Sequence, residues 1–445
     1  MAIENKEHQA VIDKVKESGA ESIHLLFTDV LGYLKTIDLT ISELDKALVE
    51  GMSFDGSSIQ GFARLEESDM IAYPDPQTLR IKESPGNGMN VAMMYCTIRT
   101  PDGITFDGDP REVLKRVLRK AAEMGYTAYV GPECEYFYLQ DAGSVPKGLD
   151  KLSYFDQGLL DLGSQVRSET VSRLRKLGIE VEYSHHEAAP SQHEIDLRYK
   201  EALEMADQVI AYRVIVKETA TVNGVHATFM PKPFNGVNGS GMHIHQSLFK
   251  GKENVFFDLK GPFELSELAL NYIAGLLKHA PAFSLVTNQW VNSYKRLVAG
   301  YEAPVYLTWA HLNRSALVRV PLYKPGKEAA TRVELRSPDP ACNPYLAFAA
   351  TIAAGLDGIE KGLTPPADTD FDVFELSLDG IKKLGIGLLP GDLSEAIKAF
   401  EQSELMREVM GEQVFKYLLA NKLAEWEAYR TRVSTWEVES LVANV

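Results

Sequence analysis

Cysteine is scarce in this 445-residue chain: Cys96, Cys134 and Cys342 are the only three, and they follow no paired spacing. This usage excludes a disulfide scaffold and a cysteine-ligated zinc site, and it predicts a reducing, cytoplasmic environment. Long apolar runs are missing as well. The most apolar stretch, residues 345–356, is too short to cross a bilayer, and the polar N-terminus has no apolar signal core. We therefore expect no membrane partner.

Basic residues are also fewer than acidic ones, 46 against 62. The formal net charge is −16, which argues against direct nucleic-acid binding, because that requires a broad basic surface. Anionic small molecules are still allowed, since arginines can gather locally. The sequence has neither a Walker A loop nor a GxGxxG, so we expect any nucleotide to be held by metal ions and arginines.

The chain is long enough for two domains, and a polar stretch at residues 100–110 predicts that they span 1–104 and 105–445. In the first we expect a helix at 4–18 and strands at 22–29, 32–39, 70–73 and 91–99. In the second we expect helices at 163–177, 201–219 and 264–279 and from 110 and 344, with strands near 131–139, 180–183, 192–196, 227–233, 242–245, 314–320 and 331–336. Because no regular βαβ alternation appears, the expected fold class is α+β.

Residues 131–139 place two glutamates, Glu133 and Glu135, in a stretch that reads as a strand. Side chains alternate along a strand, so both carboxylates share one face with Phe137. Adjacent carboxylates repel and raise each other's pKa unless a cation lies between them. Taken alone, the pair fits a solvated strand edge equally well.

Other acids and two histidines occur in similar settings. Glu187, Glu194 and Glu334 fall on predicted strands or strand ends, and His243 and His245 share one strand face. Carboxylates with at most one imidazole suit Mg²⁺ or Mn²⁺ better than zinc. The alternative for each acid is a surface charge and for each histidine a hydrogen-bonded core residue; the recurrence of the pattern favours metal binding.

Arginines gather late in the chain, at positions 296, 314, 319, 332 and 336. Arg332 and Arg336 share the strand face that presents Glu334. This arrangement fits a site where arginines bind phosphate and carboxylate oxygens, or simply an ion-paired strand. The glycine-rich residues 236–241 fit a substrate loop or a plain hairpin turn. Residues 298–304, which carry Glu302, fit an exposed loop or a mobile lid with a general base.

Several motifs occur together in a recognisable order: Phe-Asp-Gly-Ser-Ser at 54–58, Gly-Pro-Glu-Cys-Glu at 131–135, His-Glu at 186–187, Lys-Pro at 232–233, Asn-Gly-Ser-Gly-Met-His-Ile-His at 238–245, Lys-Arg-Leu-Val at 295–298, Gly-Tyr-Glu-Ala-Pro at 300–304, Asn-Arg-Ser at 313–315 and Arg-Val-Glu-Leu-Arg at 332–336. In this order the set resembles bacterial type I glutamine synthetase, and it covers the chain from about residue 16 onward. Any single motif would be weak evidence; the ordered set is specific.

The resemblance implies a role for each matching residue. One metal ion would be bound by Glu135, Glu187 and Glu194, and a second by Glu133, His243 and Glu334. Glutamate would contact Asn238, Gly239, Arg296, Glu302 and Arg336. ATP would lie against Tyr199, His245, Ser247, Arg314, Arg319 and Arg332. Asp55, Glu302 and Arg314 would be catalytic, with Asp55 deprotonating ammonium and Glu302 on a flap.

The sequence resembles the shorter alpha subclass of that family. The stretch after Leu139 is brief where the beta subclass has an insertion, and Phe374 replaces the tyrosine that beta enzymes adenylylate. Arg64 matches an arginine tied to feedback inhibition by glutamine. A departure is Ala299, where the flap commonly has proline.

The resemblance implies an N-terminal β-grasp domain on a larger catalytic domain, and two hexameric rings that form a dodecamer. The C-terminal residues would insert into the opposing ring, and in alpha enzymes they also communicate with transcriptional repressors. The implied activity joins L-glutamate and ammonia with ATP through γ-glutamyl phosphate, using Mg²⁺ or Mn²⁺ at two or more positions per subunit. The alternatives are a ligase for another amine, a non-catalytic relative and a guanidino kinase.

Overall fold

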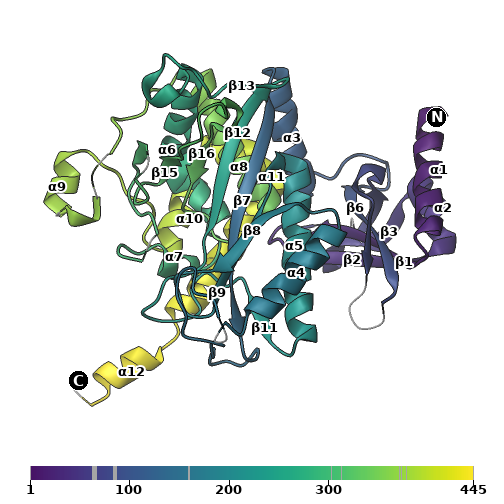
Figure 1. Cartoon of the computed structure of the whole chain (residues 1–445), viewed down its shortest axis with the longest axis horizontal. Coiled ribbons are helices and arrows are strands. Elements are labelled where there is room, and N and C mark those ends of the chain that lie inside the picture. Colours follow the sequence, from purple (N-terminus) through teal and green to yellow (C-terminus); the bar gives the residue numbers. More distant parts are fainter. Residues whose placement is uncertain are drawn as a thin grey trace.

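The computed structural model describes residues 2–62, 68–83, 88–158, 161–301, 303–311, 313–369, 371, 373–376, 378–443 and 445. These residues form two sheets, a six-stranded one near the N-terminus and a ten-stranded one in the rest of the chain. Figure 1 shows the small sheet beside a larger body in which helices pack behind the large sheet. The expected α+β class is confirmed.

The small sheet carries one parallel pair among antiparallel neighbours. Its order is β2-β1-β6-β4-β3, with β5 beside β6, and β1 runs parallel to β6. The elements are α1 (Ala2–Glu17), β1 (Ala20–Thr28), β2 (Leu34–Thr40), α2 (Leu44–Glu50), β3 (Met52–Asp55), β4 (Asp69–Pro74), β5 (Arg80–Glu83) and β6 (Asn90–Arg99). This is the expected β-grasp arrangement. One face packs under α1 and α2, where Val15, Leu25 and Ala47 are fully buried.

The large sheet has the order β14-β15-β16-β12-β7-β9-β8, and β7 also pairs with β10 and β11. Its strands are β7 (Thr127–Leu139), β8 (Val181–His186), β9 (Gln192–Leu197), β10 (Lys200–Glu201), β11 (His226–Thr228), β12 (Met242–Lys250), β13 (Glu253–Asn254), β14 (Trp309–His311), β15 (Val318–Val320) and β16 (Val333–Leu335). The pairs β8–β9, β9–β7, β7–β12, β12–β16 and β16–β15 are all antiparallel.

The helices of this part are α3 (Pro110–Glu123), α4 (Ser164–Lys176), α5 (Ala202–Val222), α6 (Glu267–Thr287), α7 (Ser293–Arg296), α8 (Pro344–Glu360), α9 (Leu378–Lys383), α10 (Leu393–Glu401), α11 (Glu404–Arg430) and α12 (Thr435–Leu441). The helix predicted after Asn343 is confirmed, and nearly all of α8 is buried. Tyr136 and Tyr138 of β7 and Tyr212 of α5 pack in the same core. The opposite face of β7 carries Glu133, Glu135 and Phe137.

Several of the predicted boundaries are wrong: the strand expected near 242–245 continues to Lys250, and the one near 314–320 begins at Val318. Two further differences have a clear physical cause. The helix expected at 264–279 runs from Glu267 to Thr287 and includes Pro281. Proline normally ends a helix because it lacks an N–H and crowds the preceding turn; here Phe283, Leu285 and Val286 are buried beyond it, and their packing outweighs that cost. The strand expected at 227–233 ends at Thr228, because Pro231 and Pro233 cannot donate to a sheet ladder.

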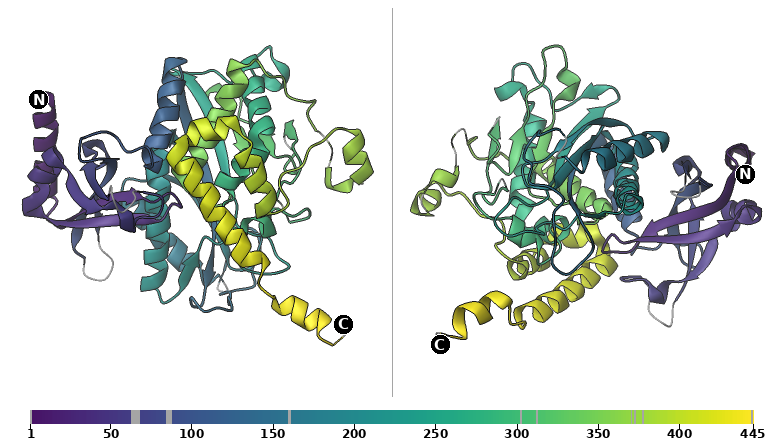
Figure 2. Two further views of the ribbon diagram at one scale, coloured as in Figure 1. Left: turned by 180° about the vertical axis from the view of Figure 1, so that it is seen from behind. Right: turned by 60° about the horizontal axis from the view of Figure 1, so that its bottom comes forward.

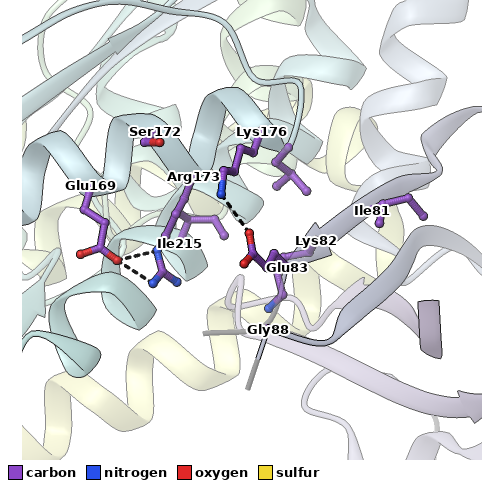
Figure 3. Close-up of a pocket in the computed structure, with 10 residues that line it drawn as sticks. Ile81, Lys82, Glu83, Gly88, Glu169, Ser172, Arg173, Lys176 and Ile215 are labelled. Carbon is purple, nitrogen blue, oxygen red and sulfur yellow. Dashed lines mark hydrogen bonds and ion pairs between the residues drawn. The ribbon is translucent and has the colours of Figure 1, made fainter. Parts of the chain in front are cut away.

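The two sheets meet through buried and charged contacts. Arg111 of α3 pairs with Asp75, which follows β4 of the small sheet, and with Asp207 of α5, each at 3.0 Å. Beside them β5 faces α4 across a pocket of about 300 Å³, shown in Figure 3. There Lys176 Nζ lies 2.9 Å from Glu83 Oε2. The small sheet is therefore fixed to the larger body by side chains from both.

The last helix stands apart from this body. In both views of Figure 2, α12 extends away from the rest of the chain, and its Trp436 is 71% exposed. A capping box at Ser434 and Glu437 begins the helix. Among the helices of the described residues, none is long and apolar enough to span a membrane.

Candidate active site

Strand β7 lies in the middle of the large sheet and aligns acids from its neighbours. Glu133 is opposite Asp196 and Glu135 is opposite Glu194 on β9, and His243 of β12 is opposite Glu133 on the other side. The predicted alternation is confirmed: Cys134, between the two glutamates, belongs to the buried core. The strand-edge alternative is wrong, because β7 is paired on both sides and Glu135 is 8% exposed.

The first group of side chains, called here the acidic cluster, contains Glu135, His185, Glu187, Glu194 and Asp196. Ligand atoms of His185, Glu187 and Glu194 lie within 4.8 Å of one another. His185 Nε2 is 3.5 Å from Glu194 Oε2, and Nδ1 is 3.7 Å from Glu187 Oε1. The Gly241 N–H (2.9 Å) and the Gln192 Nε2 (2.7 Å) both donate to Glu135 Oε2.

Electrostatic repulsion dominates the acidic cluster. Burial, followed by repulsion from Glu187, raises the pKa of Glu135 to about 8. Burial and the carboxylates of Asp196 and Glu135 raise the pKa of Glu194 well above its usual range. Burial also raises the pKa of Asp196 to about 6. Carboxylates in such surroundings hold protons in place of a cation, and an oxygen-rich donor set of this kind fits Mg²⁺ or Mn²⁺.

The second group, called here the histidine cluster, contains Glu133, His243, His245 and Glu334. Glu133 lies 3.0 Å from His243 Nδ1 and 2.6 Å from His245 Nε2, and Glu334 Oε1 is 3.6 Å from His243 Nδ1. Burial opposes ionisation of Glu133, yet His245 and His243 hold its pKa well below the usual range. Ligand atoms of Glu133, His245 and Glu334 lie within 4.8 Å of one another and form a candidate metal site, whereas His243, which the sequence predicted as a ligand, is not in that set.

Arg319 of β15 and Arg336, just after β16, both contact Glu334. Arg319 Nη1 lies 2.7 Å from Glu334 Oε2, and Arg336 also pairs with this carboxylate. Arg332 Nε donates to His245 Nδ1 at 3.0 Å. The ion-paired strand considered from the sequence is thus present in the ligand-free chain. These guanidinium groups lie beside the histidine cluster.

Arg296 and the glycine-rich loop pack tightly together. The Arg296 guanidinium is buried and donates to the carbonyls of Ser337 (2.7 Å) and Pro338 (3.2 Å). A Cβ at Gly241 would lie 2.4 Å from Arg296 Nη2, and one at Gly239 would lie 2.2 Å from the Pro231 carbonyl oxygen. A side chain at position 239 would clash with the main chain, and one at position 241 would require the buried Arg296 guanidinium to move, so glycine fits both positions best.

A cavity of about 300 Å³ adjoins the histidine cluster. It is lined by four residues predicted to contact ATP, namely Tyr199, His245, Ser247 and Arg332, together with Tyr129 and Glu133. The rings of Tyr129 and Tyr199 are 5.9 Å apart. Four of the six predicted nucleotide residues therefore surround one space, and Glu133 lies both at that space and in a candidate metal cluster.

Other predicted residues lie elsewhere. Asp55 ends β3 in the small sheet, is exposed, and accepts hydrogen bonds from the Ser57 N–H (2.9 Å) and hydroxyl (2.7 Å). Arg314 is exposed beside Tyr154. Asn238 lies in the glycine-rich loop, partly buried. Glu302 and Arg64 fall outside the described residues.

Comparison with known proteins gives a consistent result over the whole chain. Residues 19–101 match the glutamine synthetase β-grasp domain, and residues 107–441 match the glutamine synthetase catalytic domain. The chain belongs to the glutamine synthetase family. Glutamine synthetase from Mycolicibacterium smegmatis is 48% identical over 445 residues, covering 99% of this chain and 100% of that protein. The Thermotoga maritima glutamine synthetase is 44% identical over 428 residues, 96% of this chain and 97% of that one.

Solved structures agree with this family assignment. GmaS in complex with ADP superposes with a TM-score of 0.88 at 32% identity, covering 97% of this chain and 99% of that chain. The Plasmodium falciparum glutamine synthetase also gives 0.88, at 25% identity and 98% coverage of both chains. In this glutamine synthetase family member the acidic and histidine clusters accordingly lie in the catalytic domain.

Sequence reasoning missed two members of the acidic cluster. His185 alternates with Glu187 and Asp196 alternates with Glu194, so strand periodicity alone would have placed each pair on one face. The pairing of β8 with β9, which sets His185 opposite Glu194, could not be read from a single strand.

The raised pKa of Glu135 predicts that metal binding expels protons. At pH 7 a carboxyl with a pKa of about 8 is largely protonated, so Mn²⁺ must displace that proton. Apparent Mn²⁺ affinity should then rise with pH from about 6 to above 8 and level off once the group is ionised. Calorimetric titrations in buffers of different ionisation enthalpy measure the released protons. Glu135→Gln should release fewer, and absence of proton release from the wild type at pH 7 would contradict the prediction.

Proposed function

We propose that this chain is a glutamine synthetase that forms L-glutamine from L-glutamate, ammonia and ATP through γ-glutamyl phosphate, releasing ADP and phosphate for nitrogen assimilation. The observation that carries the proposal is the placement of two candidate metal clusters side by side on one sheet face. An arginine-flanked cavity adjoins one of them. Glutamate phosphorylation requires this juxtaposition, because nucleotide phosphate and substrate carboxylate must meet.

The metal ligands follow from the two clusters. Glu135, Glu187 and Glu194, with His185 nearby, would hold one Mg²⁺ or Mn²⁺. Glu133, His243 and Glu334 would hold another, and His245 is also within reach of the same two carboxylates. When bound, the cations offset the charge of the phosphate and carboxylate oxygens. The raised pKa of Glu135 and the oxygen-rich donor set support this assignment.

The chain's own side chains bind and orient the substrates. Arg314, Arg319 and Arg332 contact the phosphates, and Tyr199, His245 and Ser247 line the cavity for the nucleoside. Asn238, Gly239, Arg296, Glu302 and Arg336 hold glutamate. Guanidinium groups suit phosphate and carboxylate oxygens because they donate in pairs. Arg296 acts partly by holding the glycine-rich loop in place.

Proton transfer completes the reaction. Asp55 takes a proton from ammonium, and Glu302 removes a further proton and shields the acyl phosphate from water on the flap at 298–304. The exposure of Asp55 in the isolated chain supports a site shared between subunits, with Asp55 supplied by a neighbour in the ring.

We assign the β-grasp domain to residues 1–104, the catalytic domain to 105–445, and the chain to the bacterial type I alpha subclass, acting in the cytoplasm. Three buried free thiols support a reducing compartment.

Phe374 has no hydroxyl to adenylylate, which leaves feedback inhibition by glutamine through Arg64 as the proposed control. Arg64→Ala should lower the sensitivity of the enzyme to glutamine without changing catalysis, and a glutamine inhibition curve measures this.

The C-terminal arm supports assembly into a homo-dodecamer of two hexameric rings. Trp436, Val438 and Leu441 of α12 are exposed, an unfavourable state for apolar side chains unless a partner covers them. A cavity of about 610 Å³ lined by Tyr33, Trp290, Lys217 and Lys295 offers aromatic surface and positive charge to such a helix, which carries Glu437 and Glu439. Repressor proteins are further proposed partners of this end.

Phosphate release with each substrate omitted in turn tests the activity. Turnover should require glutamate and ammonium together, and Glu135→Ala and Glu334→Ala should each abolish it, because each removes a proposed metal ligand. Glu180→Ala, at an exposed glutamate paired with Lys200, is the control and should keep activity. Equal turnover with another amine in place of ammonium would identify a sibling ligase, and phosphorylation of a guanidino substrate would identify a kinase.

Mixed assembly tests the shared site. Asp55→Ala and Glu302→Ala subunits should each be inactive alone. Co-assembled in equal amounts, they should regain about a quarter of wild-type activity, because each site draws its two halves independently. Proven mixed particles that stay at background would contradict the shared site.

Truncation tests the role of the arm. A chain ending at Thr435 lacks most of α12 and should form hexamers or smaller particles, as measured by light scattering, since the contact between rings is lost. A full-length protein purified in parallel is the control. Dodecamers of the truncated chain would overturn the proposed role.

A further inference from the structure

The turn between β8 and β9, residues 187–191, determines where two acids of the acidic cluster lie. Glu187 is its first residue, and the Glu187 N–H donates to the Gln192 carbonyl at 2.8 Å. Glu187 Oε2 accepts from the Ala188 N–H at 2.7 Å. Just beyond the turn, Gln192 donates to Glu135. Any movement of this turn would therefore displace Glu187 directly and Glu135 through Gln192.

A single buried carboxylate from outside the sheet holds both ends of the turn. Asp150 lies in the connection between β7 and α4, and its side chain is 2% exposed. Asp150 Oδ1 accepts from His186 Nε2 (3.0 Å), at the end of β8, and from the Ser191 N–H (2.9 Å), at the end of the turn. The Leu152 N–H, in the same connection, donates to it at 3.1 Å.

His186 links Asp150 to the main chain of Glu187. Its Nδ1 lies 2.8 Å from the Glu187 carbonyl oxygen while Nε2 faces Asp150. Both ring nitrogens therefore face oxygen acceptors, which suits a ring with a hydrogen on each. Because strand side chains alternate, His186 points away from the face that carries His185 and Glu187.

The turn is also strained where Asp150 holds it. Ser191 has a φ of +63°, a left-handed conformation that residues other than glycine rarely adopt. The Ser191 hydroxyl accepts from the Asp150 N–H (3.0 Å) and donates to the Asp150 carbonyl (3.2 Å). Surrounding contacts must maintain such a conformation, and here the Asp150 main chain and side chain supply three of them.

We propose that Asp150 is a positioning residue for the acidic cluster: by holding His186 and Ser191 it fixes the turn that sets Glu187 and, through Gln192, Glu135. The inference rests on the proposed function, because it concerns the residues assigned there as metal ligands. Groups that orient metal ligands from behind commonly change metal affinity by about 10–100-fold when they are replaced.

Asp150→Asn tests the proposal in the full-length assembled enzyme, with Mn²⁺ alone as the probe. Free Mn²⁺ is measured by electron paramagnetic resonance during a titration. One class of Mn²⁺ should bind about 10–100-fold more weakly than in the wild type, while the class assigned to the histidine cluster stays unchanged. Glutamine formation should recover as Mn²⁺ is raised to saturation, because the ligands themselves are intact.

Asp109→Asn is the matched control. Asp109 is also a buried carboxylate that accepts from main-chain N–H groups, those of Ile98 (3.1 Å) and Arg111 (2.9 Å), but it lies at the junction of the two domains. Its replacement should lower thermal stability without changing Mn²⁺ affinity. If Asp150→Asn does not fold, His186→Gln, which keeps a donor toward Asp150 and loses the bond to Glu187, should show the same weakened class.

The outcomes separate this inference from the proposed function. A wild-type enzyme that binds no Mn²⁺ would remove the metal assignment itself. A wild-type enzyme that binds Mn²⁺ normally, with Asp150→Asn or the folded His186→Gln equal to it, would overturn only the positioning role. Equal weakening of both Mn²⁺ classes would also overturn that role, since it would indicate general loosening.

Discussion

Repulsion between carboxylates on one face of β7 and its neighbours is the constraint on which the site depends. Antiparallel pairing sets Glu135 opposite Glu194 and Glu133 opposite Asp196, too close for all of them to ionise without a cation. Helices and aromatic side chains bury the other face of β7, so the strand cannot rotate to expose its carboxylates to water. Keeping adjacent carboxylates buried costs folding free energy, and the packed hydrophobic core behind β7 offsets that cost.

The two clusters solve this problem in different ways. In the histidine cluster, two imidazoles lie within hydrogen-bonding distance of Glu133, and Arg319 and Arg336 supply positive charge beside Glu334 from the chain itself. In the acidic cluster protons stand in for a cation, as the raised pKa values of Glu135 and Asp196 indicate. The first cluster is thus formed before any ligand arrives, whereas the second is electrostatically incomplete. This difference fits one position that accompanies a nucleotide and one that receives a cation from solution.

Much of this could be predicted from the sequence, because strand periodicity is local. The shared face of Glu133 and Glu135, the paired histidines of β12 and the helix after Asn343 all follow from spacing of a few residues. What could not be predicted depends on distant pairing or on tertiary packing. His185 and Asp196 join the site only through the register of β8, β9 and β7, and α6 continues past Pro281 only because its far end is buried. Asp55 was placed by its motif, whereas its position away from the clusters required the fold.

The antiparallel register described for β7 also limits how this chain can change in length. Adding or removing one residue inside β7, β9 or β12 would exchange the two faces of that strand beyond the change. A core residue such as Cys134 or Tyr136 would then enter the polar face, and a carboxylate would enter the hydrophobic core. Insertions are tolerable only in the connections between strands. In the connection after Leu139, residues can be added before Asp150, but the contacts between Asp150 and Ser191 must be kept. Within a strand of the large sheet, only a change of two residues keeps each side chain on its face, so variation in chain length is expected in the loops.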